Sequence, residues 1–248
     1  MYLPQLKLAK VELKEFLRNY SAPQATCTCR AELFANSVVE KMANIIALSI
    51  NYRTFATMNK NLYIISGCNG AGKTTASFTV LPEILQCKEF VNADEIAKGL
   101  SPFNPESVAI EAGRLMLQRI DDLLERNETF SIETTLATKS YIHLVRRAQK
   151  KGYNVHLIFF WLETPELAEH RVAERVRKGG HNIPTDVIHR RYRSGICNLF
   201  KIFLNQVDTW MIYDNSKSPR VFVAKGGRTT SSYIYSEYIF NKIKSYVR

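Results

Sequence analysis

The segment LYIISGCNGAGKTT, from Leu62 to Thr75, is the most diagnostic part of this 248-residue chain. Within it, Gly67 to Thr74 fit the pattern G-x-x-x-x-G-K-[ST] of the phosphate-binding loop, or P-loop. The apolar, β-branched run before the loop is typical of a buried strand, and the residues from Lys73 onward fit a helix. A strand, a loop and a helix in this order are the context that the motif requires, so the sequence predicts a nucleotide-binding site here.

The chemistry of phosphate binding assigns a role to each part of this loop. Successive backbone N–H groups in a glycine-rich turn form a nest for anions, and the following helix adds the positive end of its dipole. Lys73 would reach the β- and γ-phosphates, and the hydroxyl of Thr74 would bind Mg²⁺. The predicted nucleotide-binding residues are Gly67, Asn69, Gly70, Ala71, Gly72, Lys73, Thr74 and Thr75.

The composition favours an anionic ligand and a reducing compartment. The formal charge is +11, from 34 Lys and Arg residues against 23 Asp and Glu residues, which suits a nucleotide, a phosphorylated sugar or a nucleic acid. A generally basic surface would give the same total, so charge alone does not select the ligand. The five cysteines are scattered and odd in number, which is typical of a cytoplasmic protein. We expect no membrane span, because no apolar run approaches the necessary length.

The first 57 residues differ from the rest of the chain. Apolar residues recur at helical spacing over Lys7–Asn19 and Arg30–Ile50, and a linker of small residues separates these two stretches. We therefore predict a helical N-terminal extension over residues 1–57, packed on the side of a P-loop kinase domain at residues 58–248. Inhibition of that domain in cis is the alternative, because the extension directly precedes the P-loop strand.

From Asn61 onward, strand-like and helix-like segments alternate. The predicted strands are Leu62–Ser66, Glu89–Asn92, Phe130–Glu133, Asn154–Trp161 and Met211–Tyr213, with Arg220–Ala224 as an edge strand. The predicted helices are Lys73–Gln86, Pro105–Asn127, Thr138–Lys151, Pro165–Lys178, Pro184–Val207 and Tyr233–Tyr246. This alternation predicts an α/β fold of the P-loop NTPase class: a doubly wound, mainly parallel sheet with helices on both faces.

Asp94 is the leading candidate for a catalytic base. In a parallel sheet, ligands bind in the crevice beyond the carboxyl ends of the strands, and Asp94 directly follows the second predicted strand. Transfer of a γ-phosphoryl group to a hydroxyl requires in-line positioning, Mg²⁺, cations and a carboxylate that accepts the hydroxyl proton. An aspartate at this position also suits the N-cap of a short helix, so the residue types alone leave both roles open.

Two further candidates follow from the end of the third predicted strand. Glu133 ends a strand that reads as buried, where an unpaired charge would be costly. We therefore predict that it contacts a Mg²⁺-bound water or a substrate hydroxyl. Thr135 is a weaker candidate on the substrate side, because a threonine at a strand end is often only a cap.

A basic segment after the fourth strand predicts a lid. Arg171 and Arg175 are four residues apart and share a helix face, and Gly179-Gly180 provides a flexible break after that helix. Arginines placed in this way could close over the triphosphate and stabilise the transition state. A solvated charged helix is the alternative, and we prefer it for Arg177 and Lys178.

The order of motifs from Leu62 to about Ala224 resembles that of the zeta toxin family of P-loop kinases. The matching segments are Gly67–Thr75, Phe90–Ile96, Ser101–Glu106, Glu111–Arg114, Ile132–Leu136, Arg171–Val176, Gly179–Pro184, Arg190–Tyr192 and Tyr213–Ser216. Several motifs in the same order make the resemblance specific over most of the chain.

The resemblance implies an ATP-dependent kinase, with UDP-N-acetylglucosamine as the best-known acceptor of the family and the 3′-hydroxyl of its sugar as the target; another nucleotide sugar, a dinucleotide or a different small alcohol is the alternative acceptor. It places Asp94 at the catalytic aspartate of the family, Lys73 at the P-loop lysine and Arg171 in the arginine-bearing lid. In this family a helical antitoxin often obstructs nucleotide binding, so such a protein is the implied partner. The substrate-side positions of the family fall on Glu133, Thr135 and, more loosely, Arg114.

Two other functions remain open at this level. A nucleic-acid end kinase would suit the positive charge, but the sequence has no basic stripe with interleaved aromatic residues, so we do not expect nucleic-acid binding. An ATP-binding switch or interaction module with slow hydrolysis would share the P-loop. Replacement of Asp94 discriminates a kinase from such a module, because only a kinase should then lose phosphoryl transfer while it still binds ATP. The sequence does not determine the acceptor or the oligomeric state.

Overall fold

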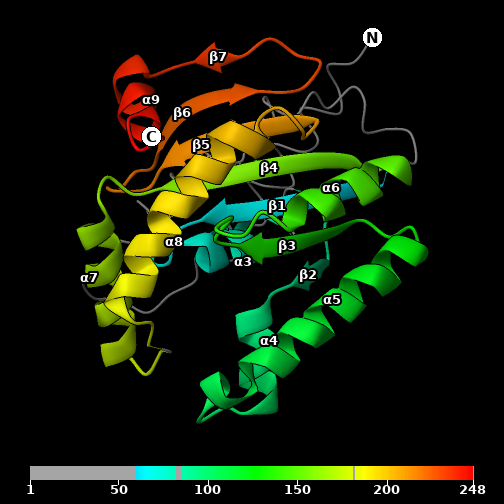
Figure 1. Ribbon diagram of the computed structural model, residues 1–248, viewed down its shortest axis with the longest axis vertical. Coiled ribbons are helices and arrows are strands. Elements are labelled where there is room, and N and C mark those ends of the chain that lie inside the picture. Colours follow the sequence, from blue (N-terminus) through cyan, green and yellow to red (C-terminus); the bar gives the residue numbers. More distant parts are fainter. Residues whose placement is uncertain (1–59, 82–84, 181, 248) are drawn as a thin grey trace, which may run out of the picture. The chain divides into compact units, whose positions relative to one another are not determined.

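The computed structural model describes residues 60–247, apart from residues 82–84 and 181, and these residues form an α/β domain (Figure 1). The extension predicted over residues 1–57 lies outside the described residues. The described strands are β1 Asn61–Gly67, β2 Glu89–Val91, β3 Phe130–Thr134, β4 Asn154–Trp161, β5 Thr209–Asp214, β6 Val221–Gly226 and β7 Tyr233–Ile234.

These strands form one sheet, in the spatial order β2-β3-β1-β4-β5-β6-β7. The pairs from β2 to β5 are parallel, and β6 and β7 are antiparallel to their neighbours, which confirms the prediction of a mainly parallel sheet. β1 is buried along its whole length between β3 and β4. The register places Ser66 of β1 beside Thr134 of β3 and Phe159 of β4. The carboxyl ends of three central strands therefore meet at one edge.

Helices cover both faces of the sheet. Right-handed crossovers between parallel strands put the helix after β1 on one face and the helices after β3 and β4 on the other, and Figure 1 shows α6 and α8 crossing in front of the strands. None of the described helices combines the length and the apolarity needed to cross a membrane. The helices are α3 Lys73–Val80, α4 Ala93–Leu100, α5 Ala109–Glu125, α6 Tyr141–Lys150, α7 Pro165–Arg177, α8 Thr185–Asn198 and α9 Glu237–Lys244, with a 3-10 turn η2 at Pro105–Val108 and a π turn η3 at Leu199–Phe203.

Side-chain caps start two helices directly at the carboxyl edge of the sheet. The Thr164 hydroxyl accepts a hydrogen bond of 3.1 Å from the backbone N–H of Leu167, so α7 begins immediately after β4. The Asn92 side chain likewise accepts a hydrogen bond of 2.8 Å from the N–H of Asp94 and caps α4. The N-cap role considered for Asp94 is therefore wrong. Its exposed carboxylate lies in the first turn of α4 instead.

The prediction of one helix over Tyr233–Tyr246 is only partly correct. Tyr233–Ile234 forms β7, which pairs antiparallel with β6, and α9 begins after Ser236, whose hydroxyl accepts a hydrogen bond from the N–H of Ile239. Aromatic and β-branched residues suit an extended edge strand, and pairing with β6 overrides their helical spacing. The edge strand of the sheet is accordingly β7 and not the predicted segment Arg220–Ala224.

Three other predicted helices differ from the structure at their ends. The helix predicted to end at Gln86 ends at Val80, and Gln86 has a φ of 49°, a left-handed backbone that cannot continue a helix. The segment Pro105–Asn127 begins with the 3-10 turn η2 before α5. The segment Pro184–Val207 is divided into α8 and η3.

Candidate active site

The phosphate loop joins β1 to α3 at the carboxyl edge of the sheet. Gly67, Gly70 and Gly72 have φ values of 142°, 77° and 79°. A Cβ atom added to Gly67 would lie 2.2 Å from the backbone oxygen of Phe160, so a residue with a side chain does not fit there. Gly72 has a left-handed backbone and is the N-cap of α3. The loop thus has the glycine-dependent shape that an anion nest requires.

Two hydrogen-bond donors and one ammonium group, from the phosphate loop and the end of β2, converge on the carboxylate of Glu133. The Oγ1 atom of Thr74 donates to its two oxygens at 3.1 and 2.9 Å, and Asn92 Nδ2 donates to Oε2 at 3.0 Å. The ammonium of Lys73 lies 3.7 Å from Oε1, with side-chain exposures of only 7% for Lys73 and 9% for Glu133. This adjacency follows from the pairing of β1 with β3, which sets Ile65 beside Glu133.

The electrostatics of this cluster reflect its burial. Burial raises the pKa of the Glu133 carboxyl, whereas the Lys73 ammonium and the Thr74 hydroxyl act in the opposite direction. The negative charge of Asp94 adds to the rise, so Asp94 lies within electrostatic reach of Glu133. The Lys73 ammonium also donates to the backbone oxygen of Cys68 at 2.9 Å. Burial raises the pKa of the Cys68 thiol to about 12, so this cysteine is a neutral packing residue of the loop.

Helix α7 packs directly on the phosphate loop and brings Arg171 to it. A Cβ atom added to Gly70 would lie 2.9 Å from the backbone oxygen of Ala168 and 3.1 Å from the Cβ of Arg171. The half-buried guanidinium of Arg171 donates to the backbone oxygen of Ser216 at 2.9 Å. Arg175, one turn further along α7, is exposed. The described contacts bring Arg171, but not Arg175, to the phosphate loop.

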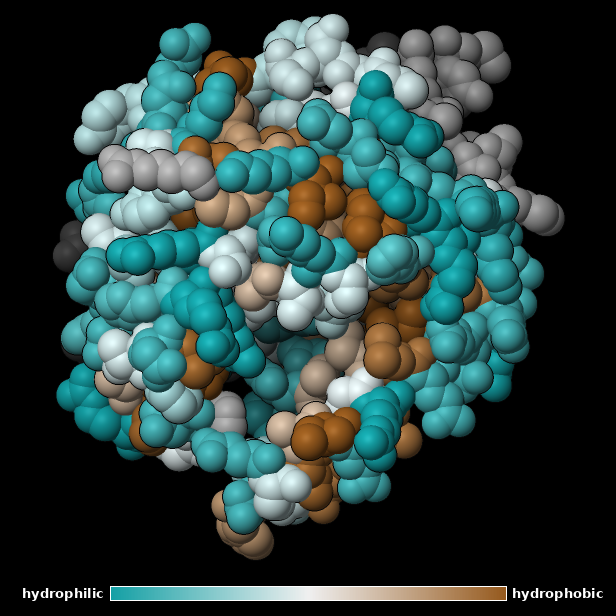
Figure 2. All heavy atoms as spheres, viewed as in Figure 1, coloured by the Kyte–Doolittle hydropathy of each residue, from teal (hydrophilic) through white to brown (hydrophobic). Residues whose placement is uncertain are grey.

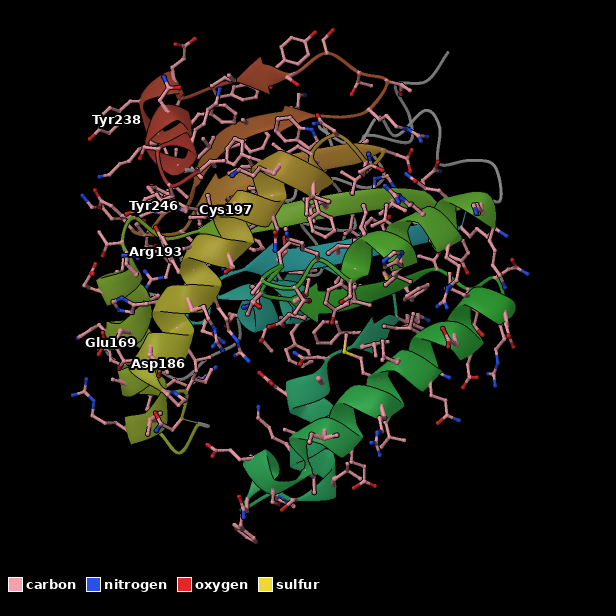
Figure 3. All side chains as sticks on the ribbon, in the orientation of Figure 1. Glu169, Asp186, Arg193, Cys197, Tyr238 and Tyr246 are labelled. Carbon is pink, nitrogen blue, oxygen red and sulfur yellow. The ribbon has the colours of Figure 1, made fainter. Side chains whose placement is uncertain are left out.

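Helices α7 and α8 are held together beside the site. Figure 3 shows Glu169 of α7 and Asp186 of α8 in the same area, where the two helices lie next to each other. The Glu169 carboxylate accepts a hydrogen bond of 2.9 Å from Thr185 Oγ1 and lies 3.2 Å from His189 Nε2. In the area where α8 faces α4, the surface is hollowed, and its depth is hydrophilic (Figure 2). The predicted lid segment thus borders the crevice.

Two residues at the phosphate loop had no assigned role in the sequence analysis. Asn215, directly after β5, donates from Nδ2 to the backbone oxygen of Ala71 at 2.8 Å. Arg220 donates from Nε to Asn215 Oδ1 at 2.9 Å. The strand-end position of Asn215 was a signal that could have identified it. Arg220 carried no such signal, because the reversal of the chain between β5 and β6 brings it back to this edge.

The two other predicted substrate residues lie outside the cluster around Glu133. Thr135 directly follows β3 and is half-buried, and its backbone oxygen faces α8, only 2.6 Å from where a Cβ of Gly195 would lie. Arg114 is exposed on α5, and no hydrogen bond or ion pair within the described part of the chain links it to Lys73 or Glu133. The substrate role of both residues stays a prediction.

A parallel sheet in this order, with a glycine-rich loop before α3 and a buried Lys–Glu pair at its mouth, defines the class of P-loop phosphotransferases. The comparison with known families agrees with this class. Residues 49–226 match the family model described as Zeta toxin, so the chain belongs to the zeta toxin family, as its motifs had indicated.

Other proteins are similar to this chain in sequence or in fold. An uncharacterised protein of Haemophilus influenzae is 30% identical over 144 residues, which cover 58% of this chain and 99% of the relative. The AvrRxo1-ORF1:AvrRxo1-ORF2 complex with sulphate ions has a TM-score of 0.64 at 16% identity, covering 91% of this chain and 80% of that one. A chain of the PezAT toxin–antitoxin system of Streptococcus pneumoniae has a TM-score of 0.55 at 18% identity, covering 85% of this chain and 93% of that one. At these identities the two structures show a shared fold.

Proposed function

We propose that this protein is an ATP- and Mg²⁺-dependent kinase that transfers the γ-phosphate to a hydroxyl of a small molecule, specifically a nucleotide sugar such as UDP-N-acetylglucosamine. The observation that carries the proposal is the convergence of Lys73, Thr74 and Asn92 on the buried carboxylate of Glu133, directly beside the phosphate loop. A cation, a hydroxyl and a carboxylate at this position are the groups that phosphoryl transfer requires from the protein.

The residues present fit both ATP and Mg²⁺. The glycine-dependent loop and the buried ammonium of Lys73 suit the phosphate groups. The hydroxyl of Thr74 and the carboxylate of Glu133 are oxygen donors that suit Mg²⁺. When bound, Mg²⁺ would neutralise negative charge on the phosphate oxygens. Two roles were predicted for Glu133: contact with a Mg²⁺-bound water or contact with a substrate hydroxyl. Its hydrogen bond with Thr74, the predicted Mg²⁺ ligand, favours the first role.

Asp94 is the proposed catalytic base. Its exposed carboxylate stands at the start of α4 on the crevice edge, close enough to influence the pKa of Glu133. It would accept the proton of the acceptor hydroxyl while the hydroxyl oxygen bonds to the γ-phosphorus. The bond from that phosphorus to the bridging oxygen breaks, and ADP leaves. Lys73 and Arg171 would offset the charge on the transferring oxygens, and Arg175 would join them if the end of α7 moved towards the crevice.

The nucleotide and the acceptor are supported by the family and by charge. A solved structure of the same fold, AvrRxo1-ORF1:-ORF2, is described with ATP, with a TM-score of 0.62 and 16% identity. The net charge of +11 suits an acceptor that is itself anionic, such as a nucleotide sugar. In this reading Thr135 and Arg114 would contact the acceptor from β3 and α5.

The test is incubation of the protein with γ-labelled ATP and Mg²⁺ against a panel of nucleotide sugars, dinucleotides and oligonucleotides. We expect label on a nucleotide sugar, and no label with Asp94→Asn. Label only on oligonucleotide ends would replace the proposal with a nucleic-acid end kinase. ATP binding without any labelled product in the whole panel would instead indicate a nucleotide-binding module.

We also propose a helical antitoxin as partner. One of the similar structures is described as the PezAT toxin–antitoxin system, and another as a complex of AvrRxo1-ORF1 with AvrRxo1-ORF2. Expression of the chain alone and together with the product of a neighbouring gene would test this. Growth inhibition that the second protein does not relieve, with no complex on gel filtration, would contradict it.

A further inference from the structure

A chain of side-chain contacts reaches the phosphate loop from the far side of the sheet edge. Arg220, just before β6, donates to the Oδ1 atom of Asn215 at 2.9 Å, and Asn215 donates from Nδ2 to the backbone oxygen of Ala71 at 2.8 Å. A Cβ atom added to Gly72 would lie 2.8 Å from the same Nδ2 atom. The carboxamide of Asn215 therefore lies against the Ala71–Gly72 peptide bond, in the middle of the loop.

This contact has a consequence for the anion nest. In a trans peptide unit the C=O and the N–H point to opposite sides. A hydrogen bond that holds the Ala71 oxygen towards Asn215 therefore holds the N–H of Gly72 on the opposite side of the peptide, away from Asn215, as one donor of the proposed anion nest. Without that bond, the peptide is able to rotate, and one donor of the nest is lost.

Arg220 determines which end of the Asn215 carboxamide faces the loop. A guanidinium can only donate hydrogen bonds, so the amide must turn its oxygen towards Arg220 and its NH₂ towards the Ala71 oxygen. The half-buried guanidinium lies 5.3 Å above the ring of Phe160, which restricts its movement. Arg220 thus acts on the loop through Asn215.

The same segment also holds the arginine of α7. The backbone oxygen of Ser216 accepts the 2.9 Å hydrogen bond from Arg171, and the Ser216 hydroxyl accepts a hydrogen bond of 2.7 Å from the N–H of Glu163, two residues after β4. The turn between β5 and β6 is therefore joined to the phosphate loop through Asn215 and to α7 through Ser216.

We propose that Asn215 and Arg220 are positioning residues that set the Ala71–Gly72 peptide for binding the phosphate groups of a nucleoside triphosphate. The inference rests on the proposed kinase function, because it assigns the loop a triphosphate ligand. The inference concerns other residues than the proposed catalytic ones. Asn215 and Arg220 do not touch the reacting atoms, and both act through the backbone of the loop.

The variants separate a hydrogen-bonded positioning role from a general structural one. Asn215→Asp keeps the shape of the side chain but turns a carboxylate oxygen towards the Ala71 oxygen, and Arg220→Met removes the donor to Asn215. Arg220→Lys retains a donor and a charge and is the conservative rescue. Arg228→Gln is the matched control, because Arg228 pairs with Asp208 at the amino end of β5, at the opposite edge of the sheet.

Binding is measured by titration with a fluorescent, mant-labelled ATP in the presence of Mg²⁺. We expect Asn215→Asp and Arg220→Met to raise the Kd about tenfold, the factor that corresponds to one well-placed hydrogen bond. Arg220→Lys should recover most of the loss, and Arg228→Gln should bind like the wild type. In steady-state assays the KM for ATP should rise while kcat changes less, whereas partial unfolding would lower kcat and leave KM unchanged.

Wild-type affinity in Asn215→Asp would overturn the inference, as would an equal loss in Arg228→Gln. If the wild type itself does not bind mant-ATP, the proposed function fails, and amide hydrogen exchange then decides the positioning role separately. Peptides covering residues 67–75 should exchange faster in Asn215→Asp than in the wild type. Equal protection in the two proteins would refute the role of Asn215, whatever the ligand of the loop.

Discussion

Glu133→Gln retains the size of the side chain and removes its charge. In the structure the carboxylate accepts hydrogen bonds from two donors, Thr74 and Asn92, and the Lys73 ammonium lies 3.7 Å from it. At an effective dielectric constant of about 20, the attraction across that distance is about 4 kcal/mol. Glutamine has only one acceptor oxygen, so its NH₂ group would face one of the donors, Thr74 or Asn92. Lys73 would lose its counter-charge, and the proposed Mg²⁺ site would lose a carboxylate ligand.

Relief from burying the Glu133 charge offsets part of this loss, because burial already raises the pKa of the carboxyl. We therefore expect a net loss of about 3–4 kcal/mol in transition-state stabilisation, which lowers kcat by two to three orders of magnitude. The assay is ADP release with a nucleotide-sugar acceptor, measured over a range of Mg²⁺ concentrations. Half-maximal activity should shift to higher Mg²⁺ in the variant.

The matched control is Glu163→Gln. Glu163 also follows a parallel strand and pairs with Lys242 at 2.6 Å, but its side chain is 43% exposed. An exposed ion pair contributes little, so kcat should stay within about threefold of the wild type. The reasoning is refuted if Glu133→Gln keeps kcat within threefold with an unchanged Mg²⁺ dependence, or if the control loses as much activity as the test variant.

Three further predictions concern single residues. Asp94→Asn should lower kcat by about two to four orders of magnitude with an unchanged Kd for mant-ATP, as expected for loss of a general base; a parallel loss of ATP binding would contradict the assignment. Burial lowers the pKa of His156 from 6.5 to about 4, so the unfolded chain binds the proton first and the free energy of unfolding should fall, by up to about 3 kcal/mol, as pH drops from 6.5 to 4. Urea titrations at several pH values measure this fall, and His156→Gln should remove it. Because burial raises the pKa of the Cys68 thiol to about 12, iodoacetamide at pH 8 should modify the half-exposed Cys197 before Cys68 in the native protein, as read by mass spectrometry; prior labelling of Cys68 would show that the loop opens.

Local sequence was sufficient for elements whose signals lie within a few residues. The span of β4 was predicted to the residue, because Val155–Trp161 is an apolar run interrupted only by His156. The start of α7 was predicted by Pro165, which follows a capping threonine. The start of α9 was not predicted correctly. Tyr233–Ile234 is a strand because it pairs with β6, and the helical spacing of residues 233–246 contains no information about that pairing.

The candidate site divides in the same way. Lys73 and Thr74 could be predicted as site residues because the P-loop is contiguous, and Asp94 and Glu133 because parallel strands present their carboxyl ends at one edge. The contact between Thr74 and Glu133 required the neighbouring positions of β1 and β3, which no local pattern specifies. Arg220 was missed for a related reason: its position depends on the antiparallel return of β6.

Sequence alone thus determined the glycine-rich loop, the alternation of strands and helices and the family, because each depends on residue types at short, fixed spacings. Tertiary structure alone decided which strand ends are neighbours, and with them the partners of the Glu133 carboxylate and of the Ala71 carbonyl. The physical reason is that strand order is set by packing and crossover handedness over the whole chain. Contacts between residues more than a hundred positions apart, such as Asn215 and Ala71, exist only once that order is established.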